Sequence, residues 1–477
     1  MKTITSKILI AFIAISMLGS CSQEFLDEPQ PTSGVPETVV FTSRAGVEAF
    51  ISGIMRRFRG QFTNVDSAGV NSIFYARTVK GNDVIAANTW FTNDYANDNR
   101  EPTYRRTSFS WNYCYYMINQ ANTLINGVEA SASLSAADKK ELAAYGYALR
   151  GFFYHQLVLE FAPTYSAGLT FPAPPIYTET AVTGNAMSTV GEVYALIVSD
   201  LTKAVDGLTA SRIGKSYINK NTANGILAQV YQVMGNKWPE AEAAAKAAYG
   251  GVPLNVLNAA SYSAGFNDYS NVEWIWGSAQ SSDQSNYYWG WPHAGTDFTT
   301  TSYAATHFNV NFVSLFSATD VRNRFVLRSS TLLPTDFRYW ITNKFKFTFD
   351  ADHPIIRTPE MILIEAEALY NQSKVTEAHN LLYVLQKNRD VNAVKSTNTG
   401  VALLNEILVE RRKELYGEIG VEWFDAKRLR RAINRTGNHR ILTPGNLAVD
   451  DKKFYLKVPQ AEIDANDLID ESVNANR

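Results

Sequence analysis

Two stretches of the sequence each read as a helix, a tight turn and a second helix. In the first, small and apolar side chains recur at helical spacing over residues 219–234 and 239–249, with Gly235 in the turn between them. Residues 357–370 and 375–389 repeat this arrangement. Because one helix pair buries only part of its apolar surface, such pairs are expected to stack on one another.

Both pairs resemble tetratricopeptide units, although their spacing differs from that of a strict array. Further helices are predicted over residues 43–59, 110–127, 135–161 and 188–208, the third with an N-cap formed by Ser135 and Asp138. Residues 60–109 are polar and irregular, and residues 260–355 show no helical pattern. The predicted fold class is therefore mainly α, a tetratricopeptide-like framework of helix pairs with a large irregular, aromatic-rich insertion.

The insertion, roughly residues 250–350, concentrates aromatic side chains in a chain that has 9 Trp, 25 Tyr and 25 Phe. Residues 272–277 alternate like a strand. The stretch 285–296 instead places four aromatic residues in five positions. Neither strand nor helix periodicity can direct all four into a core, so some of them must lie at the surface or at a site.

A second group of aromatic residues lies among polar and acidic residues in the loop over residues 88–100. Long loops in compact domains are usually functional or disordered. The apolar face of a pyranose can stack on an aromatic ring, while Asp, Asn and Arg bind its hydroxyl groups. We therefore predict a ligand-binding site built from Trp90, Phe91, Asp94, Tyr95, Tyr287, Tyr288, Trp289 and Trp291. These residues could instead pack on a partner protein or on each other.

Other function classes find little support in the sequence. The formal net charge of −2 argues against nucleic-acid binding. The six histidines lack metal-ligand spacing, and the chain has no HExxH, GxSxG, GxGxxG or P-loop motif. The acids of one loop (Asp83, Asp94, Asp98) and of one helix (Glu365, Glu367) form no recognisable pair for glycoside hydrolysis, and the loop acids do not have the spacing of a calcium loop. No catalytic residue, metal or cofactor is predicted.

The first 20 residues are predicted to be a lipoprotein signal peptide. Two lysines accompany an apolar run over residues 8–18, which is too short for a stable membrane span but typical of a signal-peptide core. The run ends in Leu-Gly-Ser-Cys at Cys21, which resembles a bacterial lipobox. We expect Cys21 to be acylated and residues 21–42 to form a tether. Cys114 is then left without a partner, so no disulfide is expected.

Residues 405–431 read as a helix, a glycine-containing turn and a short second helix. In the first helix, Glu410 and Lys413 stand three residues apart, as do Arg411 and Glu414. Side chains at this spacing are neighbours on a helix surface. The expectation from these residues alone is a packed helix hairpin with a solvated, internally paired charged face.

The strings ERRKEL and EWFDAKRL in this block resemble the C-terminal signature of the SusD/RagB family, surface lipoproteins that capture nutrients in Bacteroidetes. The helix KKELAAYGYALRGFFYHQLVLEFAPTY (139–165) resembles the family's N-terminal signature, and the end of the chain, YLKVPQAEIDANDLIDESVNANR, resembles its closing segment. Together with the lipobox, these matches follow the family's order across the mature chain. The sequence is therefore identified as a member of this family.

The resemblance implies a single SusD-like domain over residues 43–477, with an N-terminal helical part to about residue 250 and a C-terminal part from about residue 251. It implies an outer-membrane location facing the exterior, for which Glu24, Asp27 and Glu28 resemble the family's acidic export cue. It also implies that the protein delivers oligosaccharide to a SusC-like TonB-dependent barrel, over which it acts as a hinged lid. A RagB-like peptide receptor, a structural assembly subunit and a glycoside hydrolase remain alternatives.

Overall fold

The computed structural model describes residues 37–60, 64–180, 183–280, 290–300 and 302–477. The predicted signal peptide, Cys21, and Tyr287, Tyr288 and Trp289 lie outside these ranges. About 52% of the structure is helical and 7% is strand, which confirms the predicted mainly α fold. None of the helices in the described ranges has both the length and the apolar character that crossing a membrane requires.

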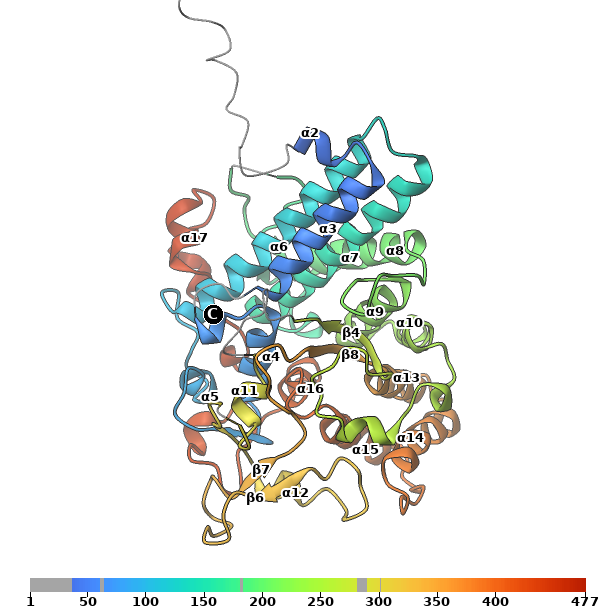
Figure 1. Ribbon diagram of the computed structural model, residues 1–477. Helices are drawn as coiled ribbons and strands as arrows, with labels where there is room; N and C mark the ends of the chain where they lie inside the picture. Colours follow the sequence, from blue (N-terminus) through green and yellow to red (C-terminus); the bar gives the residue numbers. More distant parts are fainter. Residues whose placement is uncertain (1–36, 61–63, 181–182, 281–289, 301) are drawn as a thin grey trace, which may run out of the picture.

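The N-terminal half is a series of helices that pack on one another in chain order (Figure 1). They are α3 Arg44–Arg59, α6 Arg105–Ala130, α7 Ala136–Phe161, α8 Val190–Gly207, α9 Lys220–Met234 and α10 Trp238–Tyr249. The predicted N-cap of α7 is confirmed, because the side chain of Ser135 accepts a hydrogen bond from the backbone N–H of Asp138. A short helix, α2 Glu37–Val40, lies within the stretch predicted to be a tether.

The two predicted helix pairs are both present, and they stack on each other. The first is α9 with α10, and the second is α13 Thr358–Asn371 with α14 Val375–Arg389. Helix α10 packs against α13 although the whole insertion separates them in the sequence (Figure 1). The framework of stacked helix pairs therefore continues through the C-terminal half, where α15 Gly400–Leu415 packs against α13 and α14.

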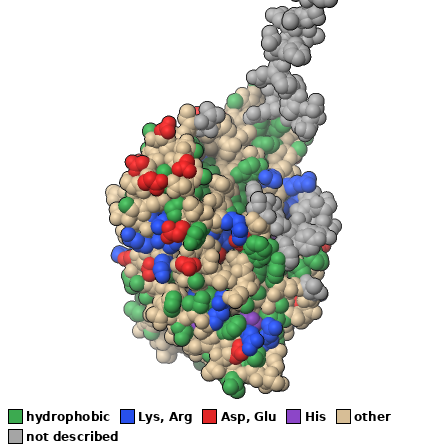
Figure 2. All heavy atoms as spheres, turned by 90° about the vertical axis from the view of Figure 1, so that its left-hand side faces the viewer, with side chains coloured by type: hydrophobic (Ala, Val, Ile, Leu, Met, Phe, Trp, Pro, Cys, Tyr) green, Lys and Arg blue, Asp and Glu red, His purple; other side chains and the backbone are tan. Residues whose placement is uncertain are grey.

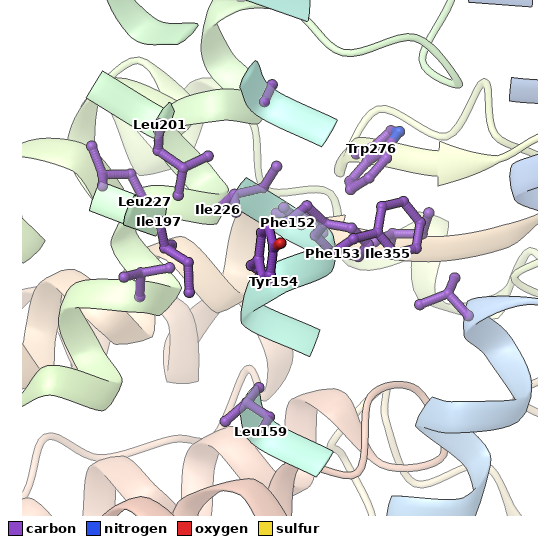
Figure 3. Close-up of a cluster of buried hydrophobic side chains, with 14 of the residues drawn as sticks. Phe152, Phe153, Tyr154, Leu159, Ile197, Leu201, Ile226, Leu227, Trp276 and Ile355 are labelled. Carbon is purple, nitrogen blue, oxygen red and sulfur yellow. The ribbon is translucent and has the colours of Figure 1, made fainter. Parts of the chain in front are cut away.

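The main hydrophobic core surrounds the C-terminal half of α7, in which every residue from 148 to 161 is buried. Because this part of the helix is covered on all sides, its apolar residues do not form a single stripe. Figure 3 shows aromatic residues of α7 between α8, α9 and the strands β4 Trp274–Ser278 and β8 His353–Arg357. The ring of Phe152 lies 4.9 Å from that of Trp276 on β4.

Residues 60–109 are more ordered than their sequence indicates. They contain α4 Val70–Thr78, β1 Val84–Ala86 and α5 Thr92–Tyr95. All nine residues of α4 are buried. A helix that is covered on every side needs no polar face, so its sequence shows no amphipathic pattern. The prediction of an irregular stretch is wrong for this helix.

The insertion contributes short strands and a second hydrophobic core. Strand β4 confirms the predicted strand and pairs with β8 in an antiparallel ladder. Three further strands, β5 Thr306–Phe308, β6 Phe325–Leu327 and β7 Trp340–Thr342, join β1 in an antiparallel sheet of order β1-β5-β7-β6. The second core packs around this sheet. The smaller elements are β2 Pro172–Ala173, β3 Ser188–Thr189, α11 His293–Thr296, α12 Val310–Val313, α16 Val421–Arg428 and α17 Gln460–Ala465.

The charged residues of α15 differ from the predicted solvated face. Glu410, Arg411 and Glu414 are buried. Glu410 pairs with Arg322 at 2.5 Å, and Arg411 pairs with Asp425 at 3.0 Å. The pairs predicted within the helix, Glu410 with Lys413 and Arg411 with Glu414, are therefore wrong. Because the C-terminal half of α15 is enclosed by other elements, its charged groups find partners on those elements instead of along the helix.

Candidate functional site

Two of the predicted site residues, Phe91 and Trp291, are buried side by side in the second core. Their ring centroids lie 5.0 Å apart, and each ring also contacts Tyr75, at 4.7 and 4.5 Å respectively. These aromatic contacts bring together α4, the turn before α5 and the segment that precedes α11. Neither ring exposes a face on which a ligand can stack, so their role in this structure is packing.

Asp94 and Tyr95, on α5, are buried as well. Asp94 pairs with the buried Arg106 at 3.2 Å. The hydroxyl of Tyr95 lies 2.8 Å from Nδ1 of His439. Both side chains therefore hold α5 against neighbouring segments, and the structure does not support direct ligand contact by them. Sequence pattern could not reveal this, because α5 is a single turn of four residues and is too short to show a helical period.

Trp90 differs from its neighbours, because its side chain is 41% exposed. The indole N–H of Trp90 lies beside the hydroxyl of Tyr303, which is half-buried. The ring of Tyr303 in turn stacks on the buried Trp291, with centroids 5.8 Å apart and planes 12° from parallel. We call Trp90 and Tyr303 the aromatic platform. The second core supports the ring of Tyr303 through Trp291, and Trp90 lies beside Tyr303.

The sheet explains why these two residues meet. Strands β1 and β5 are antiparallel, and Ala86 pairs with Thr306. The chain leaving β1 and the chain entering β5 therefore lie at the same end of the sheet. Trp90 follows Ala86 by four residues, and Tyr303 precedes Thr306 by three. The segment that carries Tyr287, Tyr288 and Trp289 joins the described chain at Gly290, next to Trp291.

A charged pair borders the platform. The guanidinium of Arg105 lies 5.3 Å from the ring centroid of Trp90, a cation–π distance. The same guanidinium donates to both carboxylate oxygens of Asp66, at 3.0 and 2.9 Å. Partial burial raises the pKa of Tyr303, so its hydroxyl stays protonated and can both donate and accept a hydrogen bond. Arg105 therefore lies over one face of Trp90, and Trp291 lies against one face of Tyr303, so the platform combines aromatic rings with a charged group.

Sequence reasoning included Tyr303 only among the aromatic residues of the insertion and missed Arg105 and Asp66 altogether. These residues and Trp90 are far apart in the sequence, and no motif or spacing links them. The composition of the insertion was the one usable signal. Their proximity depends on the pairing of β1 with β5.

Three of the acidic side chains considered for catalysis are held by other side chains. Asp83 forms an ion pair with Arg412, Glu367 pairs with Arg428, and Tyr249 donates to Glu365. Within the described ranges, no group of three His, Cys, Asp or Glu side chains is placed to hold a metal ion. Burial lowers the pKa of the histidines in and beside the second core, to about 4 for His293, 3 for His307 and 4 for His439, so all three stay neutral.

Comparison with known families gives two matches. Residues 24–232 match the SusD-like family described as "Starch-binding associating with outer membrane", and residues 343–474 match the family described as "SusD family". No curated protein matches the chain.

Solved structures share the fold over nearly the whole chain. A SusD-like carbohydrate binding protein from Bacteroides vulgatus ATCC 8482 is 24% identical, with a TM-score of 0.80, and the match covers 91% of this chain and 97% of that one. A SusD superfamily protein from Bacteroides thetaiotaomicron VPI-5482 is 24% identical, with a TM-score of 0.79 and coverage of 90% and 99%. Surface glycan-binding protein A from Bacteroides thetaiotaomicron, in complex with laminarihexaose, is 16% identical, with a TM-score of 0.67 and coverage of 88% and 97%. The two family matches, one in each half of a chain with this fold, show that the protein belongs to the SusD/RagB family.

Proposed function

We propose that the protein binds oligosaccharide at the cell surface and delivers it to a SusC-like TonB-dependent outer-membrane transporter. The observation that carries the binding step is the aromatic platform, where the exposed Trp90 lies beside the half-buried Tyr303, whose ring is stacked on the buried Trp291. Aromatic rings offer large contact area at a low cost in conformational entropy. Arg105, whose exposed side chain is held by the buried Asp66, supplies N–H donors for sugar hydroxyl groups at the platform.

The comparisons support glycan as the ligand class. The family matched by residues 24–232 is described as starch-binding, and one protein of the same fold was solved in complex with laminarihexaose. Both descriptions concern neutral polymers of glucose. Maltohexaose and laminarihexaose are therefore the first ligands to test. The proposed action is capture and delivery without covalent change, so no product should form.

The location is part of the same proposal. The family is described as associating with the outer membrane. We infer that acylation of Cys21 anchors the protein there, with the residues that precede α2 as the tether that leads to the folded domain, since Phe41, directly after α2, is already part of the main core. The transporter partner is inferred from family membership. None of these steps involves a metal or a cofactor.

The test of the binding step is titration calorimetry of the protein that begins after Cys21. Wild type is expected to bind at least one of the two hexaoses, and Trp90→Ala is expected to bind it roughly tenfold more weakly, a loss of about 1.4 kcal/mol. Leu254→Ala is the control, because Leu254 is also an exposed apolar residue and its turn packs against α14. Chromatography of the titrated sample checks that the oligosaccharide is intact.

Three other results are possible, and each would contradict a specific part of the proposal. Equal affinity of wild type and Trp90→Ala would exclude the platform as the site. Binding of short peptides, with no response to either hexaose, would favour a RagB-like peptide receptor. Shortened oligosaccharides after incubation would show hydrolysis and contradict simple capture.

A further inference from the structure

A groove separate from the aromatic platform lies between the middle of α6, the chain at residues 177–179 and 183–184, and α17. Its volume is about 410 Å³, within the usual size range of ligand pockets. Figure 1 shows α17 beside α6, and the indole N–H of Trp111 on α6 donates to Glu462 on α17 at 3.1 Å. We call this depression the α6–α17 groove.

Two half-buried tyrosine rings form part of the lining of the groove. Tyr115 and Tyr177 have ring centroids 5.7 Å apart and meet edge to face. The hydroxyl of Tyr115 donates to the carbonyl of Pro175 at 2.7 Å, and the hydroxyl of Tyr177 accepts from the backbone N–H of Asn185 at 2.8 Å. Both rings are therefore held in place before any ligand arrives. A preorganised ring loses little freedom on binding.

Amide side chains next to the rings are not used by the fold. Asn112 and Asn119 are seven residues apart, about two helical turns, so they lie on the same side of α6. Both are exposed, and within the described part of the chain their side-chain amides make no hydrogen bond. Each amide can donate and accept, which suits hydroxyl groups.

The side of the groove formed by α17 is hydrogen-bonded to the two other segments that line it. Glu462 accepts from Trp111 with one carboxylate oxygen and from Asn466 with the other, at 3.1 and 2.9 Å. Asn466 also donates to the carbonyl of Asn185 at 2.9 Å. The three segments that line the groove are therefore joined by hydrogen bonds, and the groove keeps its shape without a ligand.

The charge around the groove selects against anions. Glu179 and Glu462 line it, and no Lys or Arg is among the described residues that do so. The C-terminal segment adds exposed Asp464, Asp467, Asp470 and Glu471. Figure 2 shows acidic side chains gathered at the upper left of the face that includes α17. A carboxylated or sulfated ligand would be repelled here, whereas a neutral one would not.

We propose that the α6–α17 groove is a second carbohydrate-binding site, which takes a neutral oligosaccharide. The ligand class rests on the proposed function, but none of the residues that line the groove belongs to the platform. Arg105, at the platform, and Asn112, at the near end of the groove, are seven residues apart on α6, a rise of about 10 Å. One domain can thus hold a long glycan at two points, which raises the effective concentration of the chain at each site.

The test uses calorimetry with maltohexaose, laminarihexaose, an oligogalacturonide and a lysine-rich peptide. Wild type is expected to bind one of the neutral hexaoses at two sites. In the Trp90→Ala/Tyr303→Ala background one site should remain, and adding Asn112→Ala/Asn119→Ala should weaken it about tenfold or more. Ala465→Arg places a long side chain over the groove from α17 and should have the same effect. Gln120→Ala, one residue from Asn119 but outside the lining, is the control.

The outcomes separate this proposal from the proposed function. If wild type binds a hexaose but the groove variants bind it unchanged, the groove proposal fails and the platform stands. If the platform variants retain full binding and the groove variants lose it, the groove is the main site and the platform assignment fails. If only the peptide or the oligogalacturonide binds at the groove, its ligand class is wrong. If no hexaose binds wild type, both proposals fail.

Discussion

Glu414 lies in the interior of the molecule among three arginines. Its carboxylate contacts Arg322 at 3.2 Å, Arg357 at 3.0 Å and Arg389 at 3.0 Å. Burial by itself would raise the pKa of Glu414, but the three guanidinium groups outweigh burial and hold the pKa well below its ordinary value. The three arginines come from the insertion, from β8 and from α14. One carboxylate therefore joins elements of the framework and of the insertion.

Glu414→Gln is expected to lower the free energy of unfolding at pH 7 by about 3–5 kcal/mol, because it leaves three buried guanidinium groups short of one negative charge. Urea denaturation followed by circular dichroism measures this loss. The control is Glu240→Gln, which breaks the exposed Lys237–Glu240 pair and should cost less than about 1 kcal/mol.

The difference in stability between wild type and Glu414→Gln should depend on pH, and its direction follows from the lowered pKa of Glu414. Because folding lowers the pKa of Glu414 below the ordinary value of 4.5, the advantage of wild type over Glu414→Gln is complete above about pH 4.5. This stability advantage of wild type then declines as the pH falls toward the lowered pKa of Glu414 in the folded protein. A difference between the two proteins that stays constant below pH 4.5 would show that the ion pairs do not supply it.

At the scale of elements, the close approach of α6 and α7 depends on a glycine. A Cβ added at Gly146 on α7 would lie 2.7 Å from Cγ1 of Ile125 on α6, nearer than side chains pack. At Gly53 on α3, nothing lies within 4 Å of the added atom. These two positions allow the effect of helix packing to be separated from the general preference of helices for alanine.

Gly146→Ala is expected to destabilise the protein by about 1–3 kcal/mol, because α6 and α7 must move apart. Gly53→Ala is expected to stabilise it by up to about 1 kcal/mol, since alanine favours helix and meets no neighbour. Thermal denaturation of both variants gives the comparison. A gain in stability from Gly146→Ala would mean that the two helices separate without cost.

Elements were predictable where one side of a helix faces solvent. Helices such as α3 and α9 show their apolar stripe in the sequence and lie close to the predicted residues. Helix α4 was not found because it has only nine residues and all of them are buried, whereas the longer buried helix α13 was predicted as part of a helix pair. The partners of the charged residues on α15 were not found for a related reason. Charge at helical spacing indicates a solvated face only if the helix is exposed, and exposure depends on the tertiary structure.

At the scale of the whole molecule, the candidate site is assembled from distant parts of the chain. The platform needs the β1–β5 pairing, and the second core beneath it joins segments around residues 91, 291 and 416. Composition indicated that aromatic residues would be concentrated in two regions. It could not tell which of them would be buried, since Phe91 and Trp90 are adjacent in the sequence and differ completely in exposure.

The attachment of the whole molecule to the membrane depends, in our proposal, on acyl chains at Cys21. Each buried CH₂ group of such a chain contributes about 0.8 kcal/mol, and stable anchoring takes more than one membrane-binding signal, such as a second chain. Cys21→Ala should therefore move the protein from the membrane fraction to the soluble fraction of expressing cells, as measured by immunoblotting. Cys114→Ala is the matched control, because Cys114 is buried in the main core and its loss should leave the protein on the membrane. Retention of Cys21→Ala in the membrane fraction would contradict the lipid anchor and leave association with a partner barrel as the cause of attachment.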